Sequence, residues 1–218
     1  MMTLSAFLPR PMNLPWSERL RGAIGGGIGI AVTAVISLMT ARALHLSPWL
    51  VAPLGASAVL VFAAPASPLA QPWAVIGGNT VTAIMGVLAC HFIPDPVVAA
   101  SVAVGLAIAA MFALRCLHPP GGAMALLVVL THTQAPLFVL FPAFTNSLLL
   151  VAAGVAYHAL TRHSYPHIAK PAPVAGLVSS DFEAALAGET ELLDIDPADL
   201  KRLIAAAERH AEARRTSG

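Results

Sequence analysis

Residues 115–123 gather the side chains of this chain that are best suited to chemistry, and they read Arg-Cys-Leu-His-Pro-Pro-Gly-Gly-Ala. They lie in a long apolar region, where Arg42, Asp95 and Arg115 are the only charged residues between positions 22 and 161. A cation beside a Pro-Gly break is costly in hydrocarbon, because the freed backbone groups find no water there. Such a break is tolerated where it packs against protein or lines a polar cavity, so this segment indicates a functional site.

A second Pro-Gly segment, residues 53–61, resembles residues 120–128 at an offset of 67, and the two agree at six of nine positions. Asn79 and Asn146 match at the same offset. The sequence therefore predicts an internal duplication, in which each half contains a long, a short and a long apolar segment.

The chemistry that these segments favour is the binding of a small anion. A Pro can start a helix, because it lacks only an N–H that the first turn would leave unpaired. The N–H groups that follow and the positive end of the helix dipole suit an anion. Arg115 would add a fixed charge, and His118 a hydrogen bond or a second charge. The residues expected to bind the substrate are Pro53, Gly55, Ala56, Ser57, Asn79, Arg115, His118, Pro119, Pro120, Gly121, Gly122, Ala123 and Asn146.

The same residues also have interpretations without a ligand. Arg115 can extend to the lipid headgroups, His118 can cap a helix, and the prolines can be simple kinks. Asn79 and Asn146 can be hydrogen bonders between helices.

A membrane metalloprotein is a competing hypothesis, because Cys90, His91, Cys116, His118 and His132 are suitable ligand types. No pair of them has the spacing of a zinc motif, so we expect neither a metal nor a cofactor. A nucleophile elbow and a Walker A sequence are also absent, so we do not expect an enzyme.

The elements that position these residues belong to a membrane protein. Of 218 residues, 57% are hydrophobic and 11% are charged, against roughly 25% charged in soluble domains. The net charge of +1 gives no indication of nucleic-acid binding. Four apolar runs approach the length of a bilayer span, and two runs are shorter. The long runs are Gly22–Ala41, Trp73–Ile93, Val97–Leu114 and Ala143–Leu160, and the short ones are Trp49–Ala64 and Gly121–Leu130.

We therefore expect an all-α membrane protein with six segments, a polar lead at residues 1–21 and a membrane domain at residues 22–165. If the short segments cross, the halves are inverted; if they re-enter, the halves are parallel. The first arrangement is a common transporter plan and is preferred here. Arginines and lysine flank both ends of the domain, which predicts cytoplasmic termini in a multi-pass protein of a cell's inner membrane.

Residues 166–218 are expected to form a soluble helical tail. Residues 180–183 fit a capping box, and Asp196-Pro197 fits the start of an amphipathic helix. Its apolar face needs a partner surface, which can be the membrane domain or a second subunit of a homo-oligomer. A scaffold or sensor that signals through this tail is thus an alternative to a transporter.

The sequence His118-Pro119-Pro120-Gly121-Gly122-Ala123 resembles the motif that gives the HPP family of integral membrane proteins its name. Residues 52–58, 67–73 and 77–78 support the resemblance, which covers about residues 20–165. It implies a domain usually described with four membrane helices. Relatives in plastids and cyanobacteria are linked to nitrite transport, so the resemblance implies nitrite or nitrate as candidate substrates.

Two further features bear on the comparison with that family. Many relatives carry Thr where this chain has Met124, which weakens the nitrite assignment if that hydroxyl touches substrate. The tail around residues 192–200 resembles the lead into a paired CBS module of longer bacterial members.

Overall fold

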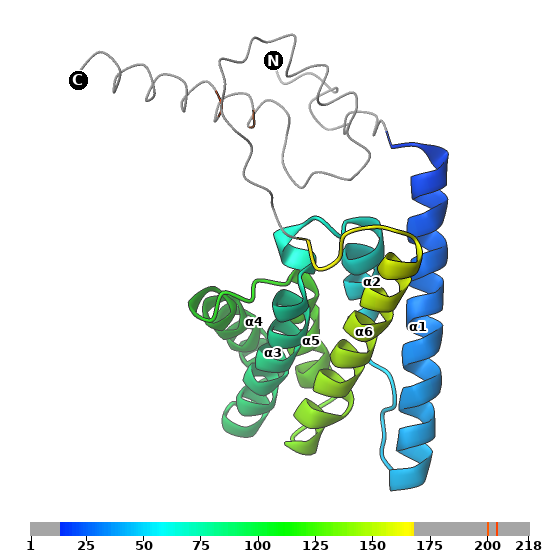
Figure 1. Cartoon of the computed structure of the whole chain (residues 1–218). Helices are drawn as coiled ribbons and strands as arrows, with labels where there is room; N and C mark the ends of the chain where they lie inside the picture. Colours follow the sequence, from blue (N-terminus) through cyan, green and yellow to red (C-terminus); the bar gives the residue numbers. More distant parts are fainter. Residues whose placement is uncertain (1–13, 168–199, 201–203, 205–218) are drawn as a thin grey trace, which may run out of the picture.

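The fold is a helical bundle, and the computed structural model describes residues 14–167 together with Leu200 and Ile204. Over these residues it contains six α-helices and no strand, which confirms the all-α prediction (Figure 1). The helices are α1 (Trp16–Leu44), α2 (Leu54–Ala63), α3 (Pro72–Phe92), α4 (Pro96–Ala113), α5 (Pro119–Leu130) and α6 (Thr145–Leu160). A 3₁₀ turn, η2 (Pro68–Ala70), precedes α3, and a π-helical segment, η3 (Val139–Phe144), leads into α6. The expected capping box lies outside the described residues, and of the expected tail helix only Leu200 and Ile204 are described, both of them helical.

In the described part of the chain, four helical stretches are long and apolar enough to cross a membrane: α1, α3, α4, and η3 together with α6. Local chemistry explains their limits. The side chain of Asp95 accepts hydrogen bonds from the N–H groups of Val97 and Val98, and Pro96 occupies the first position of α4. At the C-terminal end of α1, His45 adopts a left-handed conformation with φ 54° and ends the helix.

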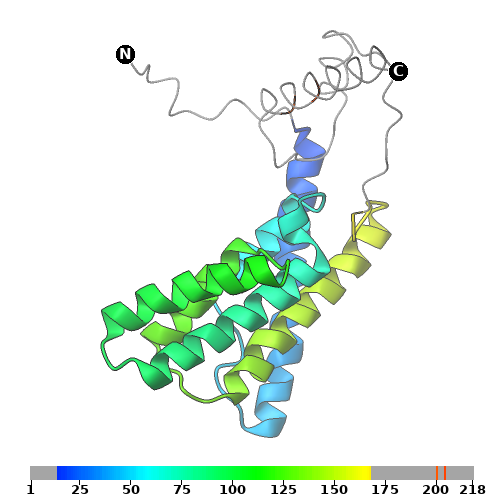
Figure 2. The same cartoon turned by 90° about the vertical axis from the view of Figure 1, so that its left-hand side faces the viewer.

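The helices form two groups of three, which Figure 2 shows from the side. One group contains α1, α2 and α6, and the other contains α3, α4 and α5. The groups meet where α3 packs against α6 and η3. Each group therefore combines helices from both halves of the sequence.

Glycines allow close approach within both groups. An added Cβ at Gly25 would lie 2.5 Å from the Tyr157 ring, and Gly29 faces the Phe62 ring at even closer range. In the other group, a Cβ at Gly86 would lie 2.7 Å from the Cβ of Val128. These contacts set the helices at the short separations that small residues permit in membranes.

The two short helices and their flanking residues run along complete long helices. Beside α6, the chain passes from Trp49, whose carbonyl bonds Asn146, to Val61, whose carbonyl bonds His158. Beside α3, it passes from Leu114, bonded by Trp73, to Val128, bonded by Cys90. The start of α1 and the end of α6 lie at one end of the bundle, which we call the shared end, and the α3–α4 connection lies at the other (Figure 1). Which side of the membrane holds the shared end stays a prediction.

Candidate functional site

A set of polar side chains lies between the two helix groups, and we call it the central polar cluster. Its members are Ser57 on α2, Asn79 on α3, His118 just before α5, and Ser147 on α6. All four are 0% exposed. Three of them are among the residues expected from the sequence to bind a substrate.

His118 anchors one side of the cluster. Its Nδ1 lies 2.8 Å from the carbonyl oxygen of Leu69 in η2. Because a carbonyl only accepts, Nδ1 carries a hydrogen and donates. Its Nε2 lies 2.8 Å from the Ser57 hydroxyl. In the neutral ring Nε2 then accepts the hydroxyl proton of Ser57, so His118 connects η2 to α2.

Asn79 occupies the centre. Its Nδ2 donates to Ser57 Oγ at 3.2 Å and to Ser147 Oγ at 3.1 Å, which uses both amide hydrogens. The Ser147 hydroxyl in turn donates to the Ala143 carbonyl at 2.8 Å. The Oδ1 of Asn79 is buried and has no protein partner within the described part of the chain. The centre of the cluster thus presents an unpaired acceptor.

A second polar site lies between α1 and α6. Asn146 Nδ2 donates to the Trp49 carbonyl at 3.1 Å, and the Ser37 hydroxyl donates to the same carbonyl. Over residues 14–167, the Oδ1 of Asn146 also finds no protein donor, and the buried hydroxyl of Thr33 is likewise unpaired. Thr33 and Ser37 are one helical turn apart on the buried face of α1.

The starts of α2 and α5 differ from the expected anion sites. Pro119 and Pro120 carry no N–H, and the N–H of Gly121 already bonds the His118 carbonyl at 2.8 Å. In α2, the N–H groups of Leu54 and Gly55 bond the preceding turn. The prediction that these first turns leave free donors is therefore wrong for these groups, because 3₁₀-type bonds take them up.

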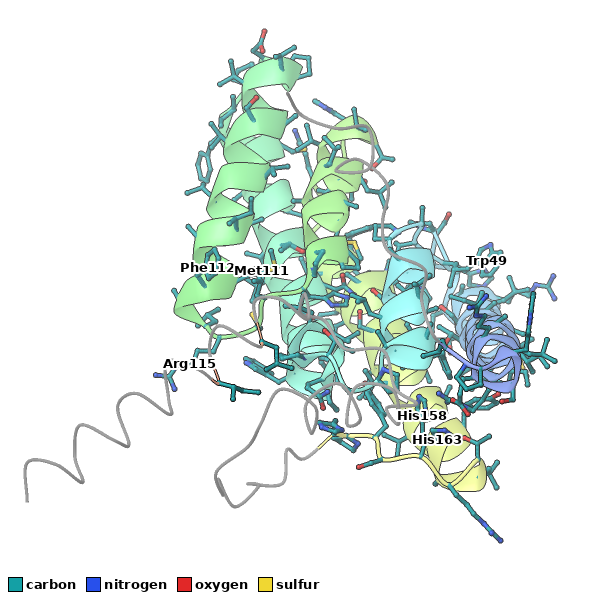
Figure 3. The ribbon with its side chains drawn as sticks, turned by 90° about the horizontal axis from the view of Figure 1, so that it is seen from above. Trp49, Met111, Phe112, Arg115, His158 and His163 are labelled. Carbon is teal, nitrogen blue, oxygen red and sulfur yellow. The ribbon has the colours of Figure 1, made fainter. Side chains whose placement is uncertain are left out.

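Arg115 does not join the cluster. It has φ 54° and lies in the turn that ends α4, where the Cys116 N–H bonds the Met111 carbonyl at 2.9 Å. Its side chain is exposed and points outward from the bundle in Figure 3. Arg115 and His118 are only three residues apart in the sequence. The left-handed turn at Arg115 explains why the first side chain is exposed and the second is buried.

The other expected residues divide between surface and packing positions. Gly55, Ala56, Pro119 and Ala123 are exposed, and Gly122 is half-buried. Pro53, Pro120 and Gly121 are buried, and Gly121 packs against Thr82 and Met111.

A charged cluster lies at the shared end of the bundle, where α1 starts and α6 ends. Arg21 donates to Glu18 at 2.6 Å and lies 3.3 Å from His158 Nδ1. His163 lies 3.2 Å from the same Glu18 oxygen, and Figure 3 shows both histidines close together there. These contacts join the start of α1 to the last turn of α6 and to the residues after it. Nearby, burial raises the pKa of the Tyr165 hydroxyl.

The residues proposed for the metal alternative do not converge. No group of three His, Cys, Asp or Glu side chains in the described residues is placed to hold a metal. Cys90 instead bonds the Val128 carbonyl through its Sγ. Both cysteines are buried and free.

The sequence prediction missed Ser147, Ser37 and Thr33. Ser37 and Thr33 share the spacing of Gly25 and Gly29 along α1, which marks one buried face. Ser147 follows Asn146 directly, so its position beside a matched Asn was the available signal.

An all-helical bundle with four membrane-length stretches and a buried polar interface defines a multi-pass membrane protein. Residues 11–166 match the family model described as "HPP, transmembrane region". The chain therefore belongs to the HPP family.

Two relatives come from Dictyostelium discoideum, and both are named transmembrane proteins. One is 37% identical over 119 residues, which are 51% of this chain and 38% of the relative. The other is 34% identical over 146 residues, which are 63% of this chain and 51% of the relative. The chain thus spans about half the length of these relatives, or less. No solved structure matches it.

Proposed function

We propose that this member of the HPP family is a transporter or channel for a small inorganic solute. The observation that carries the proposal is the central polar cluster, which is fully buried between the two helix groups. Polar side chains inside a membrane domain are costly, and they commonly mark a substrate pathway. If these side chains served only to hold the helices together, we would expect each of their polar atoms to have a hydrogen-bond partner. The Oδ1 of Asn79 has none in the described protein.

A small inorganic anion remains the proposed cargo, with nitrite and nitrate as the first to test. The exposed Arg115 supports it as a charge that attracts anions towards the end of the bundle nearest His118. This role differs from direct binding in the cluster, because the guanidinium lies outside it. We further propose that the shared end of the bundle faces the cytoplasm of a cell's inner membrane, as the flanking basic residues indicate.

The proposal includes an internal duplication, which several contacts support. Val61 and Val128 are 67 residues apart, and each carbonyl accepts a bond from a helix of the opposite half. The donors are Cys90 on α3 and His158 on α6. The group α1, α2 and α6 becomes the group α4, α5 and α3 when the two halves are exchanged.

Uptake by proteoliposomes containing the full chain tests the transport proposal. We expect protein-dependent uptake of nitrite that His118→Ala reduces, because this variant removes the link between Leu69 and Ser57. The matched control is His91→Ala, since His91 is exposed at the end of α3. Equal uptake by the two variants would contradict the site. No protein-dependent uptake of any small anion would contradict transport and favour the scaffold or sensor hypothesis.

A further inference from the structure

The unpaired groups of the buried sites define the chemical form in which a substrate can be held. We propose that the substrate crosses the bundle as a neutral molecule that carries its own hydrogen-bond donor. For a weak inorganic acid this species is the undissociated acid HX, not the anion X⁻. The inference rests on the proposed transport function and specifies the substrate of the same path.

The orientation of the Asn79 amide is fixed by its neighbours. The Ser147 proton goes to the Ala143 carbonyl, so Ser147 Oγ can only accept from Asn79. In the neutral-ring state the Ser57 proton goes to His118 Nε2, so Ser57 Oγ also accepts from Asn79. Both constraints place the NH₂ group on the serines, and the buried oxygen is left for a donor.

The Asn146 amide is fixed by a separate constraint. Its contact is a backbone carbonyl, that of Trp49, which only accepts. The facing atom is therefore the amide nitrogen, and the buried oxygen again lacks a donor. Thr33, a turn from Ser37 on the same face of α1, adds an unpaired buried hydroxyl that can donate.

A bare anion fits these groups poorly. It accepts hydrogen bonds but donates none, so it would leave both amide oxygens unpaired and would face their negative ends. No cationic side chain of the described residues takes part in the central polar cluster, and Arg115 is exposed. An anion would thus be buried without a counter-charge, which costs far more than burying a neutral molecule. An undissociated acid supplies an O–H for an amide oxygen and an oxygen for a hydroxyl such as that of Thr33.

The proton balance of this step is simple. On one side X⁻ combines with a proton from solution, and the O–H bond of HX forms. HX crosses, and on the other side the O–H bond breaks to release X⁻ and the proton. Each cycle moves one anion and one proton in the same direction, and no net charge crosses the membrane.

The test compares sodium nitrite with sodium nitrate in proteoliposomes of the full chain, with protein-free vesicles as the background. Nitrous acid is a weak acid and nitric acid a strong one, so only nitrite has an accessible neutral form. We expect protein-dependent nitrite uptake that carries one proton per nitrite and is unchanged by a potassium diffusion potential of either sign. Nitrate uptake should equal the background. Uptake that follows the imposed potential, or equal rates for nitrate and nitrite, would overturn the inference while leaving transport intact. Absence of uptake above background for both salts would overturn transport itself.

Two variants connect this behaviour to the unpaired groups. Thr33→Val preserves shape and removes a hydroxyl that bonds nothing in the described protein, so the variant should fold normally. We expect it to lower nitrite uptake about fivefold, the factor supplied by one net hydrogen bond of about 1 kcal/mol. Thr40→Val is the matched control, because it makes the same change two turns further along α1, at a hydroxyl that already bonds the Ile36 carbonyl outside the buried polar sites. Equal uptake by the two variants would mean that Thr33 holds a resident water only, and would overturn its assignment to the path.

Discussion

Replacing Gly78 by Ala provides a sharp test of how the central polar cluster is positioned. A Cβ at this position would lie 2.6 Å from His118 Cβ and 2.9 Å from the Cys116 carbonyl oxygen. Ordinary contact begins at 3.4 Å, so the segment that carries His118 must move by about 0.8 Å, the difference between 3.4 and 2.6 Å. A shift of this size is enough to break the 2.8 Å bond between His118 and Ser57.

The energy follows from comparison with Gly105→Ala on α4, where an added Cβ meets nothing within 4 Å. Both changes gain the same helix propensity, so that gain cancels in the difference between them. Overpacking costs about 1–3 kcal/mol, and the lost hydrogen bond costs about 1 kcal/mol. For a domain of this size each kcal/mol lowers Tm by about 2–4 °C.

We therefore expect Gly78→Ala to melt at least about 4 °C below Gly105→Ala in detergent. It should also lose nitrite uptake in the assay described above. If the two variants melt at the same temperature, the close packing of α3 against the His118 segment is wrong, and with it the argument for how the cluster is held.

Three further predictions concern topology and local bonds. The first uses a background in which both cysteines are replaced by Ala, and introduces Asp95→Cys or Arg162→Cys. The two new thiols should react with an impermeant thiol reagent from opposite sides of the membrane. Labelling of both from the same side would contradict six crossings. Tyr165→Phe removes a 2.9 Å bond to the Ala70 carbonyl and should lower Tm by about 2–4 °C in a thermal melt; an unchanged Tm would show that this bond adds no stability. Asp95→Ala removes an acceptor that caps two N–H groups of α4 and should cost about 1 kcal/mol by the same measurement, whereas Asp95→Asn should retain most of the stability.

The helices were predictable from the sequence because apolar runs and their boundary residues act locally. Pro72 and Pro96 each open a helix one residue before the expected start, and Pro119 opens α5 two residues before it. The expected span ending at Ala41 extends three residues further, because Arg42, Ala43 and Leu44 stay helical until His45 adopts a left-handed conformation. The segment expected at residues 49–64 is helical only from Leu54, and its earlier part is the non-helical flank that bonds α1 and α6.

The site was only partly predictable, because it depends on tertiary packing. His118, Ser57 and Asn79 stood out as polar residues in apolar surroundings, and the fold brings them together. The direction of Arg115 depends on a single left-handed residue. The use of the first-turn N–H of Gly121 depends on a local bond to the His118 carbonyl, which sequence spacing alone does not specify.

The mixed make-up of the two helix groups has a consequence for biosynthesis. The second group, α3, α4 and α5, is complete once residue 130 has been made. The first group must wait for α6, whose Tyr157 and Leu150 cover the glycine face of α1 at Gly25 and Gly29. Among the described helices α1 is made before all the others, yet its packing is completed last, and it has to keep its glycine face available in the membrane until α6 is inserted.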